Sequence, residues 1–415
     1  MPTFLPSTHP GGSGVDRVYV PRLSGGRPSP HPDQTLRVFY PAAQVPKPSG
    51  GWPVLMYSPS GVFSNLFTID TIDETTSPKL LHKALVSGWC VVVVRTVGLN
   101  SDPALLPIPG AAPNLFHPFA SAEWDRFDVY WGEKDFSWAR QYLAEYADSV
   151  DPDGWPALEI DNDKVVTSGV SSGSVYAAFV ALGRDRAYAS SATQTSRSTR
   201  CAGFIGYSCP TWMPAFDEAT AATHWPSCED PSVRAATIAE AHLPTLIAAS
   251  PSTWVREPGS HAATTPCVLA YDEGVATDDM RRTHPTSGFC GVPNPADPEF
   301  AMHLRGDPCL RNTIPPNGDP GQIHDYWFGR VLYADLKNVA ALHATESQLI
   351  VSSELLATYP QLPVRHTGSF ADDRELQRTA HLWLRQRIRP QVRATPSRPT
   401  ALGPRGQRED DADRG

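Results

Sequence analysis

The clearest chemical pattern in this chain is the sequence Gly-Val-Ser-Ser-Gly, with Gly169, Ser171 and Gly173 at its key positions. A β-branched run, 165–167, precedes it, and apolar residues at helical spacing follow it in 175–182. The segment therefore predicts a strand, a tight turn that carries Ser171, and a helix. Small flanking residues allow the strand and the helix to pack closely. A serine hydroxyl on such a turn could attack a carbonyl carbon, with helix N–H groups beside it to stabilise the developing negative charge.

The segments around this turn predict alternating strands and helices. Runs of strand length and pattern lie at 36–41, 52–57, 89–94, 165–167, 202–207 and 348–352. Helical spacing or helix start and stop signals mark 77–88, 133–150, 323–339 and 371–388. The run 89–94 is apolar on both faces, as in a parallel sheet that helices cover on both sides. The predicted fold class is α/β, with a mostly parallel central sheet, helices on both faces and loop insertions.

Proline-rich segments separate these elements and predict long loops. The 42 Pro are concentrated in connecting segments. Insertions are predicted near 98–132, 209–232 and 279–322. The domain is predicted over 34–390, after an N-terminal extension, 1–33. Residues 391–415 are rich in Pro and Arg and then in Asp and Glu, so we expect a disordered tail.

Composition limits the classes of protein to which the chain can belong. With 415 residues, 40% hydrophobic and 19% charged, it has the composition of a globular protein with a sizeable core. The net charge of -9 argues against a nucleic-acid partner. No apolar run reaches transmembrane length, so no membrane span is expected. The N-terminus lacks the basic flank and apolar stretch of a signal peptide, which predicts a cytoplasmic protein; if the N-terminus is truncated, a secreted protein is expected instead.

The cysteines do not indicate a metal site. The chain has 7 Cys, with no Cys-x-x-Cys motif and no tight His/Cys cluster, so no metal is expected. Cys209 with Cys228, and Cys290 with Cys309, lie in loop-like segments and could form disulfides if the protein is exported.

The order of elements resembles the α/β-hydrolase family over most of residues 36–388. The resemblance is carried by Ser171 on a strand-to-helix turn in mid-chain, by the turn 58–63 after a buried strand, and by His366. The family uses the chain order nucleophile, acid, histidine. One departure is the turn 58–63, which begins Ser-Pro-Ser-Gly in place of the family's usual His-Gly-Gly-type sequence. The subfamily therefore stays open.

The resemblance implies a base that removes the proton of the Ser171 hydroxyl. A serine hydroxyl is a poor nucleophile at neutral pH unless a base lies within hydrogen-bond reach and a third group orients that base. In this fold the base lies on a loop after the last strand and before the closing helix, which singles out His366. His381 falls within the expected closing helix, and His343 comes too early.

The resemblance also implies an acid after the seventh strand, and the sequence offers several. Two apolar runs, 243–248 and 266–271, both fit that strand, and we cannot choose between them. Asp272 ends the second run, whereas Asp319 comes just before the helix expected from residue 323. The sequence Ile-His-Asp-Tyr-Trp at the start of that helix resembles the family segment that shortly follows the acid, which favours Asp319. The remaining candidates are Asp278 and Asp325.

Two backbone N–H groups are expected to bind the oxyanion of the tetrahedral intermediate. One donor is Ser172, directly after the nucleophile. The other is expected in the turn 60–62, where Gly61 would let the backbone approach the substrate.

Together these residues predict a serine hydrolase of carboxylic esters that works through an acyl-enzyme, without a cofactor. The substrate would be a small-molecule or polymeric ester, and the Trp, Phe and Pro of the insertions favour an apolar or aromatic acyl group. A lipase, a polyester depolymerase and a peptidase are alternatives in the same class; the lack of a blade-length repeat argues against the peptidase. A non-catalytic binding protein on the same fold is the alternative from another class. The sequence does not indicate an oligomeric state.

Overall fold

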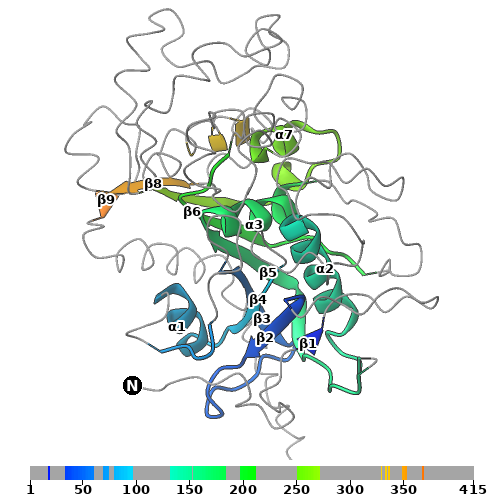
Figure 1. Ribbon diagram of the computed structural model, residues 1–415. Coiled ribbons are helices and arrows are strands. Elements are labelled where there is room, and N and C mark those ends of the chain that lie inside the picture. The colour runs from blue at the N-terminus through cyan, green and yellow to red at the C-terminus, as the bar shows by residue number, and fades with distance from the viewer. Residues whose placement is uncertain are drawn as a thin grey trace, which may run out of the picture.

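Figure 1 shows the computed structural model of the protein. The structure describes residues 17–18, 33–59, 69–73, 79–96, 131–151, 153–183, 197–211, 250–271, 329, 332–333, 335–336, 348–352 and 367–368. The strands are β1 (Arg17–Val18), β2 (Thr35–Phe39), β3 (Trp52–Ser58), β4 (Cys90–Val94), β5 (Ile160–Val170), β6 (Gly203–Tyr207), β7 (Cys267–Tyr271), β8 (Gln348–Ser352) and β9 (Thr367–Gly368). The helices are α1 (Lys79–Val86), α2 (Trp131–Glu145), α3 (Ser172–Leu182) and α7 (Pro251–Arg256), with the short 3-10 helix η4 (His261–Ala263). The described residues between 329 and 336 are also helical.

The described strands form one sheet in the order β1-β2-β4-β3-β5-β6-β7-β8-β9. The pairs from β4 to β9 along this order are parallel, whereas β1 and β2 at one edge pair antiparallel. The predicted class, an α/β fold with a mostly parallel sheet, is confirmed. The position of β7 resolves the choice left open by the sequence, because β7 corresponds to the run 266–271. The other run, 243–248, lies outside the described residues.

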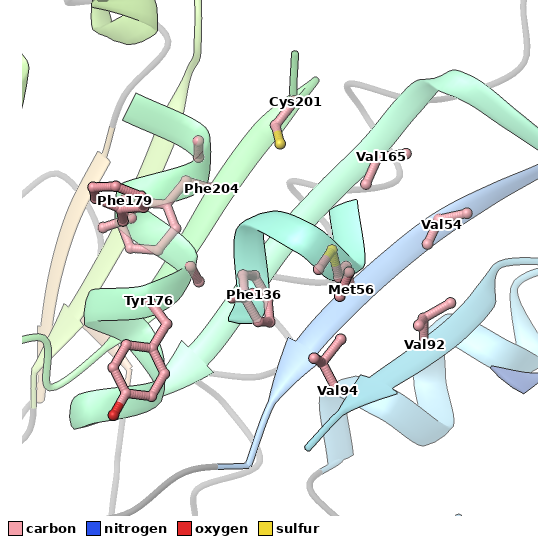
Figure 2. Packing of buried hydrophobic residues seen from close by; sticks show 14 of the residues in the cluster. Val54, Met56, Val92, Val94, Phe136, Val165, Tyr176, Phe179, Cys201 and Phe204 are labelled. Atoms are coloured by element: carbon pink, nitrogen blue, oxygen red, sulfur yellow. The ribbon is translucent and has the colours of Figure 1, made fainter. Parts of the chain in front are cut away.

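Two hydrophobic clusters cover the two faces of this sheet. On one face, side chains of α2, α3 and α7 form a cluster with alternate residues of the central strands, among them Met56 and Val92 (Figure 2). On the other face, α1 packs against the intervening residues, such as Leu55 and Val91. Every residue of β4 is buried, as its apolar sequence predicted. Helices therefore lie on both faces, and Figure 1 shows α1 on the side opposite α2 and α3.

Helix α2 ends earlier than its sequence pattern predicts. The apolar stripe of the predicted helix 133–150 continues to Tyr146, but the helix ends one residue before it. The carbonyls of Tyr146 and Ala147 accept hydrogen bonds from the N–H groups of Leu158 and Glu159, at 2.9 and 2.6 Å. Because residues distant in the sequence use these carbonyls, the helical hydrogen-bond ladder stops here.

Other predicted boundaries also differ from the structure. The helix predicted from residue 133 begins two residues earlier, at Trp131. The strand before Ser171 is longer than predicted and starts at Ile160. The strand predicted as the last one, 348–352, is β8, but β9 follows and pairs with its final two residues. A strand of two residues is too short to show alternation in the sequence. The helix predicted over 371–388 lies outside the described residues.

One cysteine expected to form a disulfide on export is a free thiol in the structure. Cys209 is fully buried and free. Burial raises the pKa of this thiol to about 12, against the opposing effect of a hydrogen bond with Ser174. Cys209 is therefore protonated and poorly nucleophilic near neutral pH. Cys228, Cys290 and Cys309 lie outside the described residues.

Candidate functional site

Ser171 occupies a strained turn between β5 and α3. We call residues 169–173 the Ser171 turn. The φ of Ser171 is 52°, in the left-handed region, where holding a residue with a side chain costs about 1–3 kcal/mol. The Ser171 N–H donates to the Tyr207 carbonyl of β6 at 2.9 Å, and the Ser171 carbonyl accepts from the Ser174 N–H at 3.0 Å and from the Ser174 hydroxyl. These hydrogen bonds hold the strained conformation.

Two glycines allow the strand and the helix to meet at this turn. A Cβ on Gly169 would lie 2.3 Å from the carbonyl carbon of Gly173. A Cβ on Gly173 would lie 2.5 Å from the carbonyl oxygen of Ser58, at the end of β3. Both obstacles are backbone atoms, which a rotamer change cannot move. The two glycines are therefore required by packing, as the motif predicted.

The Ser171 side chain is close to the positive end of a helix but does not cap it. Ser171 is the N-cap residue of α3, yet its hydroxyl makes no capping hydrogen bond. The first turn of α3 holds no acidic residue, and Ser172, its first residue, is fully buried. N–H groups at a helix N-terminus favour negative charge. The local arrangement thus suits a reaction in which negative charge develops beside Ser171.

Helix α3 is held in place by tight packing on its α2 side. Tyr176 of α3 lies against the start of α2, where a Cβ on Gly132 would come within 2.1 Å of the Tyr176 ring. Farther along α3, Phe179 meets Trp254 of α7 edge-on, with ring centroids 4.9 Å apart. Figure 2 shows Tyr176 and Phe179 projecting from the same helix among the core residues. These contacts fix the direction of the helix whose first turn adjoins Ser171.

The structure brings together two of the predicted site residues, Ser171 and Ser172. The others lie outside the described residues: Gly61, Asp272, Asp278, Asp319, Asp325 and His366. In the sequence, Asp272 directly follows β7 and His366 directly precedes β9. Strand β9 is the fourth strand from β5 in the sheet, roughly 19 Å away at the usual strand spacing. Because His366 lies outside the described residues, its contact with Ser171 stays a prediction.

Sequence reasoning did not single out a second strained serine, Ser208. It follows β6 as Ser171 follows β5, has a φ of 48°, and donates its N–H to the Ala270 carbonyl at 2.7 Å. The sequence did carry a signal, since Gly206 and Ser208 repeat the Gly-x-Ser spacing at the end of an apolar strand. We call residues 206–210 the Ser208 turn.

A buried carboxylate that the sequence did not single out lies beside α7. Asp335 is 1% exposed and accepts a hydrogen bond from the Arg256 guanidinium at 3.0 Å. Burial raises the pKa of Asp335 to about 7, and the nearby Arg256 only partly opposes this shift. In the sequence Asp335 stands between Ser171 and His366, as a triad acid would, but its carboxyl group is already engaged with Arg256.

Neither a metal site nor a membrane span occurs in the described part of the chain. Within the described residues, no group of three or more His, Cys, Asp or Glu could hold a metal ion. None of the helices in this part of the chain combines the length and the apolarity needed to cross a membrane.

Comparisons with known proteins give likenesses in structure only. No family model matches the chain, and no curated protein matches it in sequence. Similar solved structures include esterase 2 of Thermogutta terrifontis phosphonylated by sarin, with 12% identity over 90% of this chain and 94% of that chain and a TM-score of 0.44. The same enzyme phosphoramylated by tabun has equal identity and coverage and a TM-score of 0.43. Its butyrate-bound form has 15% identity over 72% and 81% of the two chains and a TM-score of 0.35.

The fold of this chain is assigned from its own elements. The sheet is mostly parallel with helices on both faces, and Ser171 lies at the carboxyl end of the central strand β5, at the start of a helix. This arrangement is an α/β-hydrolase-like fold.

Proposed function

We propose that the protein is a serine hydrolase that cleaves carboxylic esters through an acyl-enzyme, with Ser171 as the nucleophile. The observation that carries the proposal is the position of Ser171, with its positive φ, at the N-terminus of an 11-residue helix, where two glycines pack against backbone. Strain of this kind persists only where the surrounding structure maintains it, and it is concentrated at functional sites. The Ser171 turn accordingly corresponds to the nucleophile elbow of α/β-hydrolases.

In the proposed reaction the Ser171 hydroxyl attacks the ester carbonyl while the imidazole of His366 accepts its proton. The N–H groups of Ser172 and Gly61 bind the oxyanion of the tetrahedral intermediate, and the alcohol leaves with the proton from His366. Water then attacks the acyl-enzyme by the reverse proton path and releases the carboxylic acid. No cofactor takes part in these steps.

The acid that orients His366 is proposed to be Asp319, with Asp272 as the alternative. In the sequence Asp319 comes after β7 and before the described helical residues 329, 332–333 and 335–336, as the family pattern requires. Asp272 is supported by its place in the sequence directly after Tyr271, because β7 ends with Tyr271 at the edge of the sheet where β5 leads into Ser171. Asparagine variants of the two carboxylates distinguish them, because only one should lose activity.

The insertions are proposed to define the substrate class. The segments near 98–132, 209–232 and 279–322 contain many Trp, Phe and Pro, which favours an apolar or aromatic acyl group on a small-molecule or polymeric ester. A lipase and a polyester depolymerase use the same chemistry on longer substrates. A binding protein on the same fold would show no ester hydrolysis.

Hydrolysis of p-nitrophenyl esters of increasing acyl length tests the proposal. We expect the wild-type protein to release nitrophenol and the Ser171→Ala variant to lose this activity to near background. Ser208→Ala is the matched control, because it removes a second strained serine hydroxyl at the end of a parallel strand. Equal activity of the wild type and Ser171→Ala would contradict the proposal. A preference for long acyl chains would favour the lipase.

A further inference from the structure

Two buried serine hydroxyls near the Ser171 turn have no hydrogen-bond partner among the described residues. They belong to Ser58 on β3 and Ser168 on β5, and both side chains are fully buried. A buried hydroxyl without a partner destabilises the folded state. Such groups are uncommon in native proteins, and each calls for an explanation.

The two hydroxyls lie on opposite faces of the sheet. Ser58 is two residues after Met56, which belongs to the core cluster on the α3 face. Ser168 is two residues after Val166, which belongs to the cluster on the α1 face. Because side chains alternate along a strand, Ser58 faces α3 and Ser168 faces α1. The two hydroxyls therefore have the same chemistry and the same burial, but only that of Ser58 lies on the face of the sheet that α3 covers.

Ser58 lies directly against the first turn of α3. Its hydroxyl oxygen is 3.0 Å, and its carbonyl oxygen 2.5 Å, from the position of a Cβ on Gly173. In the sheet Ser58 is paired with Gly169, the other glycine of the Ser171 turn. In the sequence it comes shortly before Gly61, the second proposed oxyanion donor. Ser58 thus adjoins the helix turn that supplies one donor and begins the segment that supplies the other.

We infer that Ser58 is a positioning residue of the acyl-transfer site. Its hydroxyl, which has no hydrogen-bond partner among the described residues, completes the hydrogen bonding of the first turn of α3 as the tetrahedral intermediate forms. An interaction that is stronger in the transition state than in the ground state accelerates the reaction. The hydrogen bond formed in the transition state then offsets the unfavourable free energy of burying the Ser58 hydroxyl. This inference rests on the proposed serine-hydrolase function.

Paired Ser58→Ala and Ser168→Ala variants test the inference. Each removes a buried unsatisfied hydroxyl, so each should leave the thermal midpoint unchanged or raise it by about 2 °C. We expect Ser58→Ala to lower kcat roughly threefold to tenfold with KM unchanged, which corresponds to the loss of one net hydrogen bond. Ser168→Ala should keep the kcat of the wild type. Ser58→Cys, a near-isosteric weak donor, should fall between Ser58→Ala and the wild type.

Every other outcome counts against the inference. An unchanged kcat in Ser58→Ala, or an equal loss in Ser168→Ala, would overturn it. A lowered thermal midpoint of Ser58→Ala would also overturn it, because the hydroxyl would then be used in the resting fold. Failure of the proposed function is separately visible, since the wild type would then hydrolyse no ester or Ser171→Ala would retain full activity.

Discussion

The Ser171 turn and the Ser208 turn are two versions of the same backbone device. Each follows a parallel strand with the spacing Gly-x-Ser, and each serine has a positive φ, 52° and 48° respectively. In each, the serine N–H donates to a carbonyl of the next strand in the sheet, at 2.9 and 2.7 Å. The strained backbone therefore recurs at neighbouring strands and does not by itself make a catalytic site.

The two turns differ in the residues that come after the serine. After Ser171 come Ser172 and Gly173 and a helix of 11 residues, whose N-terminus favours negative charge. After Ser208 come Cys209 and Pro210, and the proline has no N–H to donate. The helix N-terminus and the second glycine therefore distinguish a site for an oxyanion from a strained end of a strand.

Removal of His366, the proposed base, should have the largest effect, because only the Ser171 turn is proposed to depend on it for activity. We expect His366→Ala to lower kcat by about 10³-fold or more, because Ser171 then lacks its proton acceptor. His381→Ala, on the expected closing helix, serves as the control and should keep its activity. Steady-state kinetics on a p-nitrophenyl ester measures both. Equal activities of the two variants would contradict the assignment of His366.

The acid is decided by a second pair of variants. One of Asp319→Asn and Asp272→Asn should lose about 10³-fold or more in kcat, since an unoriented imidazole is a poor base. The other should stay within about twofold of the wild type. Loss of activity in neither variant would remove both carboxylates from the mechanism.

The glycines of the two turns should differ in their effect on stability. A Cβ on Gly169 meets backbone of α3, whereas a Cβ on Gly206 meets the ring of Phe204 at 2.6 Å, and a ring can shift. We expect Gly169→Ala to lower the free energy of unfolding by about 3 kcal/mol and Gly206→Ala by roughly 1 kcal/mol. Urea denaturation of the two variants compares them. A larger loss at Gly206 would show that the Ser208 turn is the more constrained of the two.

A weaker effect, on the Ser208 side, is a pH dependence of stability. Ser252 of α7 donates its N–H to the Thr211 carbonyl just beyond the Ser208 turn, and the Arg256 of the same helix holds Asp335. The pKa of Asp335 is raised from 3.8 to about 7, so the folded state keeps a proton that the unfolded state has lost. Stability should therefore fall as the pH rises from about 4 to 7.

Asp335→Asn tests this linkage. The variant should show a flatter dependence of the thermal midpoint on pH between 4 and 7, whatever its absolute stability. Ester hydrolysis at Ser171 should retain its pH profile, because Asp335 is not part of the proposed triad. If the thermal midpoint of Asp335→Asn depends on pH as strongly as that of the wild type, Asp335 is ionised throughout this range.

Local patterns in the sequence predicted the elements that carry Ser171. Apolar runs such as 52–57 and 89–94 are buried on both faces, and their short length between turn signals favours a strand within a sheet. The end of α2 was missed because it depends on hydrogen bonds from Leu158 and Glu159, which no pattern near Tyr146 encodes. The burial of the Ser58 hydroxyl depends in the same way on packing between β3 and α3.

A covalent label mapped to its residue tests the role of Ser171 without any choice of ester. A fluorophosphonate reacts with an activated serine, and mass spectrometry of the digested protein locates the adduct. We expect an adduct on the peptide that contains Ser171 and none on the peptide that contains Ser208. An adduct on Ser208, or an unlabelled Ser171 in a protein that hydrolyses esters, would contradict the assignment of Ser171 as the nucleophile.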